Sequence, residues 1–143
     1  MPGIDECLLQ AMGLPGARGA AIVDWTSGLA LGTTGEAPGG DHEATAAETA
    51  ELARMAAEYA SFAPDDPWVG DAGADPAGGD APAKGLPVED LIVTTRTGYH
   101  VMRFVETTFD SSVFLHLWLD RDLGNLALAR IRLHDLAERL ALG

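Results

Sequence analysis

The chain has 143 residues, of which 47% are hydrophobic and 22% are charged, the balance of one soluble globular domain. Its formal net charge of −13 repels phosphate groups and anionic lipid headgroups, and no run of Lys or Arg offsets it. We therefore expect neither nucleic acid nor a membrane surface among its partners. Cys7 is the only cysteine, which excludes an intramolecular disulfide and a multi-thiolate zinc site and favours a cytoplasmic location.

The N-terminal part of the sequence predicts a short helix followed by a β-hairpin. Residues 4–13 form the helix, because their apolar side chains recur at helical spacing. Two short apolar runs, 19–25 and 29–34, then flank a turn at Gly28, and glycine's freedom at positive φ suits such a tight connection.

A long helix is predicted from Asp41, its N-cap, to about Ala63, because this stretch is dense in Ala and Glu. One stripe of this helix carries large apolar side chains: Leu52, Met55, Tyr59 and Phe62. A second stripe carries only methyl groups: Ala46, Ala50, Ala53, Ala57 and Ala60. We expect the large stripe to cover the core. The alanine stripe either admits a second helix at close range or simply reflects a high alanine content.

Residues 64–87 are an irregular acidic insert. They contain five Pro, five Gly, five Ala and five Asp with almost no hydrophobic periodicity. Trp68 stands out in this polar context and is a candidate partner contact, although an aromatic side chain in such a place also packs back onto its own domain.

Three strands and a closing helix are predicted in the C-terminal half. Residues 88–96, 98–106 and 112–120 are strand-like and are separated at hairpin-loop distances. The last of these strands is nearly continuously apolar, as expected for a central strand that is covered on both faces. Residues 125–142 place their leucines on one face of a final helix.

The order of elements is therefore α-β-β-α-β-β-β-α. It predicts an α+β sandwich in which helices cover both faces of a five-stranded antiparallel sheet. We expect residues 1–143 to form a single domain, interrupted by the insert.

The sequence offers little support for bound cofactors. It contains neither GxxxxGK[ST] nor a GxGxxG motif after a strand, so no nucleotide is expected as a ligand. The histidines are scattered, without a spacing diagnostic of zinc: His42, His100, His116 and His134. Two of them, His100 and His116, approach each other across the last hairpin only if the strand register allows it.

No constellation for covalent catalysis emerges either. Cys7 lies on an apolar helix stripe, where a packed core thiol is expected, and Ser27 is interpreted as a turn residue because the glycine pattern of a nucleophile elbow is incomplete. We therefore expect the chain not to be an enzyme.

Two segments resemble the roadblock (dynein light-chain 7) domain family, in the manner of a bacterial, actinobacterial-like member. The segment GAAIVDWTSGLALG is similar to the opening hairpin of these domains, with Asp24, Gly28 and Leu29 in the matching places. The segment VFLHLWLDRDLGNLALARIRLHDLAERL is similar to their final strand and closing helix. The residues that fit the start of that helix are Asn125, Leu126, Leu128, Ala129 and Arg130, with Ala127 in place of the usual glycine.

The resemblance implies a profilin-like sandwich, with the long helix on one face of the sheet and the terminal helices on the other. It also implies a homodimer in which edge strands join and the long helices pack together. The interface would then contain Ala46, Ala50, Ala53 and Ala57 on the helix and Leu91, Val93 and Thr95 on the edge strand. Bacterial relatives look like regulators of small Ras-like GTPases, so the implied function is a non-enzymatic regulator or scaffold without a cofactor.

Two other functions remain open from the sequence. A profilin-like sensory domain would hold a small ligand between helix and sheet, in a pocket lined by Trp25, Trp118 and Tyr99. An enzyme would need a turnover that depends on one of the histidines.

Overall fold

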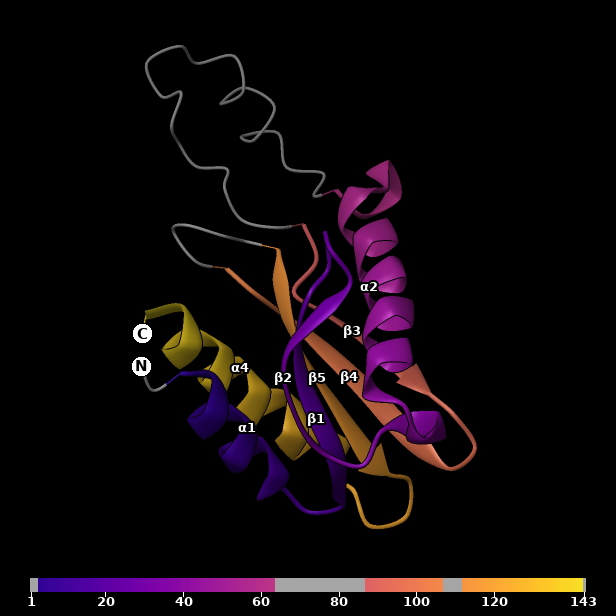
Figure 1. The fold of residues 1–143 in the computed structure, drawn as a ribbon, viewed down its shortest axis with the longest axis vertical. Helices are drawn as coiled ribbons and strands as arrows, with labels where there is room; N and C mark the ends of the chain where they lie inside the picture. The colour runs from indigo at the N-terminus through magenta and orange to yellow at the C-terminus, as the bar shows by residue number, and fades with distance from the viewer. Residues whose placement is uncertain (1–2, 64–86, 107–111, 143) are drawn as a thin grey trace.

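The computed structural model describes residues 3–63, 87–106 and 112–142. The sheet has five antiparallel strands in the order β2-β1-β5-β4-β3 (Figure 1). The strands are β1 (Ala17–Asp24), β2 (Leu29–Gly35), β3 (Asp90–Thr94), β4 (Gly98–Val105) and β5 (Val113–Asp120). The helices are α1 (Ile4–Met12), α2 (His42–Glu58) and α4 (Leu126–Leu142), with short 3₁₀ turns η1 (Pro38–Gly40) and η2 (Ala60–Phe62). The predicted α+β architecture is confirmed. The insert residues 64–86, including Trp68, lie outside the described residues.

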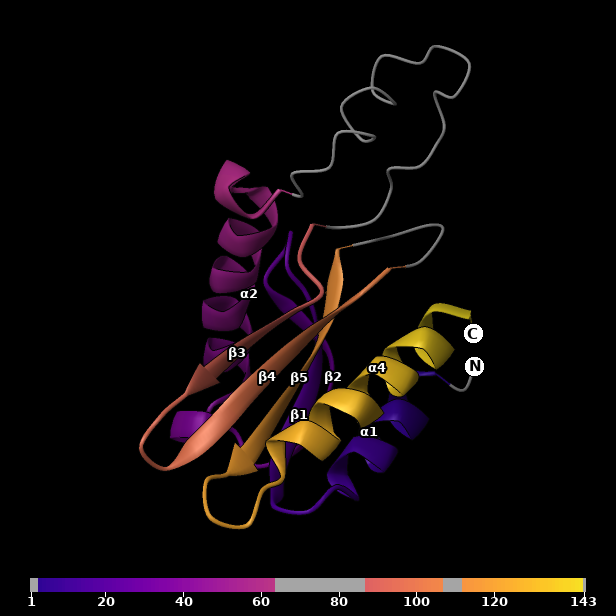
Figure 2. The ribbon, with the colours of Figure 1, turned by 180° about the vertical axis from the view of Figure 1, so that it is seen from behind.

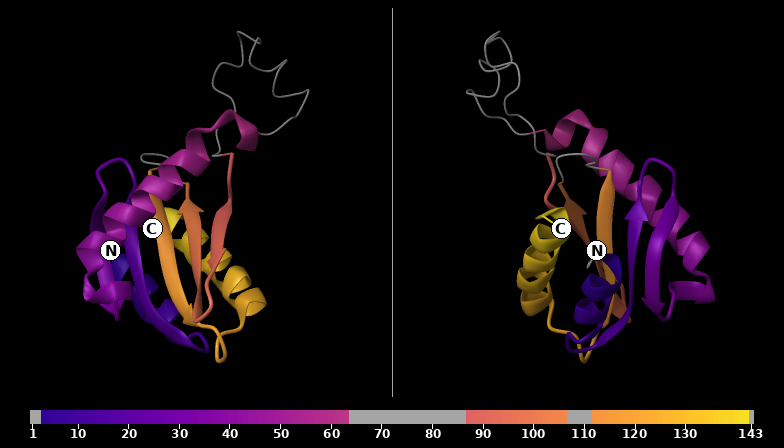
Figure 3. Two further views of the ribbon diagram at one scale, coloured as in Figure 1. Left: turned by 90° about the vertical axis from the view of Figure 1, so that its right-hand side faces the viewer. Right: turned by 60° about the vertical axis from the view of Figure 1, so that its left-hand side comes forward.

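The helices form two layers on opposite faces of the sheet. Helices α1 and α4 lie side by side on one face, and α2 crosses the other face obliquely (Figures 2 and 3). Strand β5 is the central strand, and the side chains from Phe114 to Leu117 are buried on both faces. Its nearly continuous apolar sequence is explained by this position, because helices cover both faces of the strand over Phe114 to Leu117.

Asp24 closes the β1–β2 hairpin. Its Oδ1 accepts hydrogen bonds from the backbone N–H of Thr26 at 2.9 Å, from Thr26 Oγ1 at 2.7 Å and from Ser112 Oγ at 3.2 Å. The side-chain bond from Thr26 contributes most to the lowered pKa of Asp24. Gly28 completes the turn at φ 79°, and Ser27 accepts a hydrogen bond from the N–H of Leu29, so its interpretation as a turn residue is confirmed.

Helix α2 begins where predicted but ends earlier. The carboxylate of Asp41 accepts hydrogen bonds from the N–H groups of Glu43 and Ala44 at 3.0 and 3.2 Å, which is N-cap geometry. The helix ends at Glu58 because Tyr59 adopts an extended conformation with φ −76° and ψ 137°. A separate 3₁₀ turn follows, so the predicted continuation to Ala63 is wrong.

The assignment of the two α2 stripes is also wrong, because the alanines and not the large residues face the core. Ala46, Ala50 and Ala53 are at most 3% exposed and pack against a cluster from the sheet. That cluster includes Ala21, Val23, Met102, Phe104 and Phe114. The aromatic side chains of the sheet fill the space beneath the helix, so only methyl groups fit on its inner face. In contrast, Met55, Tyr59 and Phe62 are 41%, 55% and 53% exposed.

The opposite core lies between the sheet and the helices α1 and α4. Cys7 is buried in it beside Leu8 and Leu136. Burial raises the pKa of the Cys7 thiol to about 11, with Arg139 acting in the opposite direction. At neutral pH this sulfur is a protonated core group, which confirms that Cys7 packs in the core.

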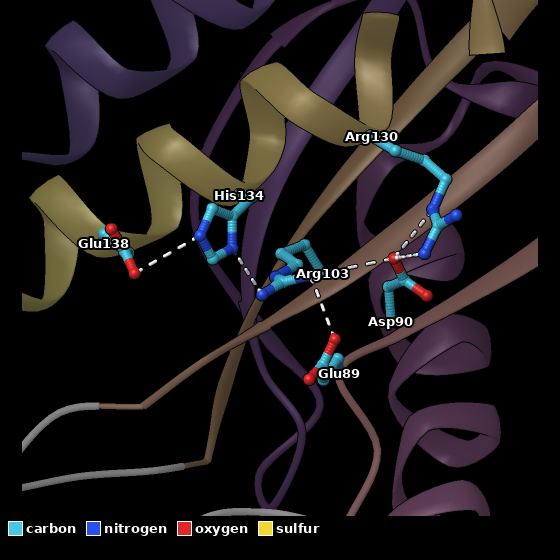
Figure 4. A network of polar contacts seen from close by, with 6 residues as sticks. All are labelled: Glu89, Asp90, Arg103, Arg130, His134 and Glu138. Carbon is cyan, nitrogen blue, oxygen red and sulfur yellow. Dashed lines mark hydrogen bonds and ion pairs between the residues drawn. The ribbon is translucent and has the colours of Figure 1, made fainter. Parts of the chain in front are cut away.

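A network of charged side chains fixes the edge strand β3 to its neighbours (Figure 4). Asp90, the first residue of β3, lies 3.7 Å from Arg103 of β4 and 3.1 Å from Arg130 of α4. Arg103 also donates a hydrogen bond of 2.7 Å to Nδ1 of His134. The side chains of Asp90 and Arg103 are only 14% and 15% exposed, so this pair is more strongly coupled than a surface ion pair.

Replacing a buried alanine tests how α2 packs against the sheet. We expect Ala53→Leu to lower the free energy of unfolding by about 1–3 kcal/mol, because the larger side chain overpacks the contact with Phe114 and its neighbours. Ala44→Leu, at an exposed position of the same helix, should change it by less than about 0.5 kcal/mol. Urea denaturation measures both, and an Ala53→Leu variant as stable as the wild type would contradict this packing.

The charged network gives a second stability test. Asp90→Ala should lower the free energy of unfolding by about 2–4 kcal/mol, because the mostly buried guanidinium of Arg103 loses its buried carboxylate partner and keeps only the exposed Glu89 at 4.0 Å. The matched control is Glu138→Ala, which removes the 66% exposed partner of His134 and should have an effect below about 0.5 kcal/mol. Thermal or urea unfolding that gives equal losses for the two variants would argue against the network.

Candidate interaction surface

Strand β3 presents an unpaired edge. It is the last strand of the described sheet, and its inner side pairs with β4 from Asp90↔Arg103 to Thr94↔Tyr99. Thr95 donates to the carbonyl of Gly98 at 2.8 Å, and Phe104 donates to the carbonyl of Glu89 at 3.1 Å. Because hydrogen-bonded pairs alternate along an antiparallel ladder, the N–H groups of Ile92 and Thr94 point to the outer side. In the part of the chain that the structure describes, no strand pairs with this side of β3, so these groups can pair with another strand.

The other edge strand of the sheet is less suited to pairing. The register of β1 and β2 shifts between Ile22 and Val23, so β2 carries an irregularity in its middle. Such bulges twist an edge and discourage the addition of a strand. Strand β3 pairs with β4 without a shift and is therefore the regular edge of the sheet.

Helix α2 presents an uncharged stripe towards the β3 side of the sheet. Ala47 lies on the opposite flank of the helix, next to the β1–β2 turn. A Cβ atom built on Gly28 of this turn would lie 3.8 Å from the Cα of Ala47. Thr45, on the other flank, lines a small space together with His116 and Trp118 of β5. The stripe follows from Thr45 at helical spacing: Thr49, Leu52, Ala56 and Tyr59, with Met55 beside it.

The sheet itself is incompletely covered next to this stripe. Because α2 crosses obliquely, the end of the sheet face near the β3–β4 turn lies beyond the helix (Figure 3). Four half-buried side chains lie on this face: Leu91, Val93, His100 and Trp118. We call the α2 stripe, these four residues and the outer side of β3 together the edge surface.

The structure separates the predicted interface residues into two groups. Leu91 and Val93 lie on β3 and belong to the edge surface, whereas Thr95 follows the strand and accepts a hydrogen bond from Gly98 N at 2.9 Å within the turn. The alanines Ala46, Ala50 and Ala53 are buried against their own sheet, and Ala57 is partly buried there too. These alanines are therefore not an outward helix–helix contact, and this part of the prediction is corrected.

Sequence reasoning recognised the large members of this stripe, Leu52, Met55 and Tyr59, but assigned them to the core. Met55 and Tyr59 are exposed, whereas Leu52 is half-buried and Ala56 is buried. The signal of the stripe was present in the sequence, as uncharged residues recurring at steps of four and three from Thr45 to Tyr59. Glu43, Glu51, Arg54 and Glu58 lie elsewhere around the helix and are exposed. The exposed Glu48 lies at the margin of the stripe, four residues before Leu52.

The residues proposed for a ligand pocket do not converge. Tyr99 packs with the core on the α1 and α4 side of the sheet, while Trp25 packs beneath α2 on the opposite side. The space between α2 and the sheet beside Trp118 has a volume of about 10 Å3, room for one water molecule at most. This geometry contradicts the predicted ligand pocket.

Other kinds of site find little support among the described residues. Within residues 3–63, 87–106 and 112–142, no group of three or more His, Cys, Asp or Glu side chains could hold a metal ion. None of the helices in these ranges is long and apolar enough to span a bilayer. His100 and His116 do meet, with 3.0 Å between Nδ1 and Nε2, so the register brings this pair together.

The fold has counterparts among solved structures. A roadblock/LC7 domain from Streptomyces avermitilis matches with a TM-score of 0.63 and 15% identity, over 96% of this chain and 94% of that one. Myxococcus xanthus MglB matches with a TM-score of 0.62 and 16% identity, over 95% of this chain and 80% of that one. The gliding protein MglB from Thermus thermophilus matches with a TM-score of 0.63 and 18% identity, over 96% and 84%.

At the level of sequence, no family model and no curated protein matches the chain. The structural likeness extends over nearly all of the chain and includes a structure described as a roadblock/LC7 domain. The chain therefore has the roadblock/LC7 fold.

Proposed function

We propose that this chain is a non-enzymatic regulatory or scaffold protein that acts as a homodimer and binds a small Ras-like GTPase. The observation that carries the proposal is the edge surface, where a regular unpaired strand lies beside exposed apolar side chains of α2. An unprotected edge of this kind is a template for pairing with another strand.

A second copy of the chain is the partner that fits this edge most simply. Two β3 strands related by a two-fold axis run antiparallel and exchange the outward hydrogen bonds of Ile92 and Thr94. The same axis brings the two α2 stripes together, so that Leu52 and Tyr59 of each copy lose contact with water. The joined sheet then has no open β3 edge.

The GTPase as partner is supported by the resemblance of the sequence and by the shared fold. Structures named MglB and a roadblock/LC7 domain have this architecture, and the motif resemblance implies GTPase regulation. A scaffold needs no reactive group, and the buried, protonated Cys7 is unsuited to act as a nucleophile. A cytoplasmic location belongs to the same proposal.

The edge pairing is tested by proline substitutions at matched positions. Thr94→Pro removes an outward N–H of β3 while leaving the ladder with β4 intact, and we expect it to raise the dimer Kd about tenfold to a hundredfold, because symmetry counts each lost bond twice. Sedimentation velocity over a concentration series gives the Kd, and circular dichroism checks that the fold is retained.

The control uses the opposite edge of the sheet. Glu36 donates to the carbonyl of Arg18 at 2.9 Å, so the alternation places the N–H of Thr33 on the outer side of β2. Thr33→Pro should leave the dimer Kd unchanged. A wild-type chain that stays monomeric at micromolar concentration, or equal effects of the two prolines, would speak against dimerisation through β3.

The GTPase is tested with purified Ras-like GTPases of the host, loaded with GDP or with a non-hydrolysable GTP analogue. We expect one of them to bind with a Kd of about 1–10 μM and to prefer one nucleotide state. Isothermal titration calorimetry measures this, and Thr94→Pro should bind more weakly if the dimer supplies the docking surface. Absence of binding in both nucleotide states would remove the GTPase from the proposal.

A further inference from the structure

The edge surface contains a row of stacked rings that dimerisation would cover. The guanidinium of Arg18 lies 3.8 Å above the Trp118 ring. The other rings follow in order, with Trp118 and His100 stacked at 6.0 Å and His100 and His116 stacked at 5.3 Å between centroids. His116 is only 3% exposed, while His100 is half-buried and reaches the uncovered part of the sheet face.

The two histidines share one hydrogen bond. His100 Nδ1 and His116 Nε2 are 3.0 Å apart, so one of these nitrogens donates and the other accepts. Burial, followed by the charges of His100 and His42, lowers the pKa of His116 to about 3. His116 therefore stays neutral at physiological pH. Burial also lowers the pKa of His100, whose side chain is only half-buried and remains in contact with water.

Among residues 3–63, 87–106 and 112–142, no unpaired carboxylate is found beside His100. Strand β5 contributes His116, α2 contributes His42 near its start, and β1 contributes Arg18, all neutral or cationic groups. The one carboxylate lining the adjacent space, Glu36 of β2, is paired with Arg18 at 2.9 Å. On β3 the neighbour of His100 is Val93, an apolar residue. A proton on His100 is thus stabilised mainly by water.

We propose that protonation of His100 opposes self-association through the edge surface, so that the dimer dissociates as the pH falls. The inference rests on the proposed homodimer. His100 lies on β4, one strand from the pairing edge, and a second copy seated on the edge surface removes water from its ring. Removing water penalises the charged imidazolium, because the described residues around His100 in its own protomer provide no unpaired carboxylate to replace the lost hydration. Two-fold symmetry places two such histidines in each dimer.

The sign of the pH effect follows from linkage. In the proposed dimer the pKa of His100 is lower still than in the free protomer. The dimer therefore has its full association free energy at pH values above the His100 pKa of the free protomer. This free energy is lost as the pH falls through that pKa. A protonated His100 ring is attracted to the Trp118 ring on which it stacks, but the guanidinium of Arg18 already lies over the Trp118 ring.

The overall charge of the molecule predicts the opposite trend. The net charge of −13 at pH 7 makes two copies repel each other, and acidification towards the isoelectric point near 4.4 weakens this repulsion. Without a local effect, the dimer should therefore become tighter in acid. A weaker dimer in acid identifies a titrating group at the interface.

The experiment measures the dimer Kd by sedimentation velocity at about pH 7.5 and about pH 5.5, at constant ionic strength. We expect the Kd of the wild type to rise at the lower pH, since protonation of one His100 in each protomer is linked to dissociation. His100→Gln should abolish or reverse this rise. His134→Gln, which removes an exposed histidine on the α4 face, should keep it.

The possible failures are distinguishable. A wild-type dimer whose Kd is unchanged or lower at the acidic pH overturns the inference and leaves the proposed dimer standing, as does a rise that persists in His100→Gln. A chain that is monomeric at both pH values overturns the dimer and the inference together. If His100→Gln does not fold, an NMR titration of the wild-type His100 ring decides, because its pKa must be lower in concentrated than in dilute samples.

Discussion

The contact between the alanines of α2 and the sheet determines where every other feature of the surface lies. Ala46, Ala50 and Ala53 allow the helix to lie close to Phe114 and its neighbours, so the volume of this core comes from the sheet and not from the helix. The larger residues of α2 consequently point sideways and outwards. Because the alanine face of α2 packs on the sheet, the uncharged stripe with Leu52 and Tyr59 lies on the flank of the helix towards β3.

The sequence was sufficient to predict the number, type and order of the described elements. Periodicity separated helices from strands, and capping residues such as Asp41 marked the start of α2 within a residue. Which stripe of α2 faces the core could not be derived in the same way. Side-chain size suggested that the large stripe was buried, but the choice depends on the volume supplied by Phe104 and Phe114, which only the packed structure reveals.

The polar contacts of the edge surface depend on strand register, which the sequence left open. In the structure Phe114, His116 and Trp118 share one face of β5, as alternate residues of a strand do. Whether His100 lay beside His116 required the pairing of β4 with β5, because a slip of one residue would move His100 to the other face. Arg103 likewise gained its role through its position opposite Asp90.

Strand β4 links the two faces of the molecule at the edge strand. On one face Arg103 binds Asp90 and His134, which ties β3 to α4 within a single protomer. On the other face His100 lies next to Val93 on the surface that a second copy would cover. The charged network holds β3 in place within the single protomer, so the proposed association would not have to order that strand. In the proposed dimer, the energetic balance would depend on the other face, where the hydration of His100 would oppose the burial of apolar side chains.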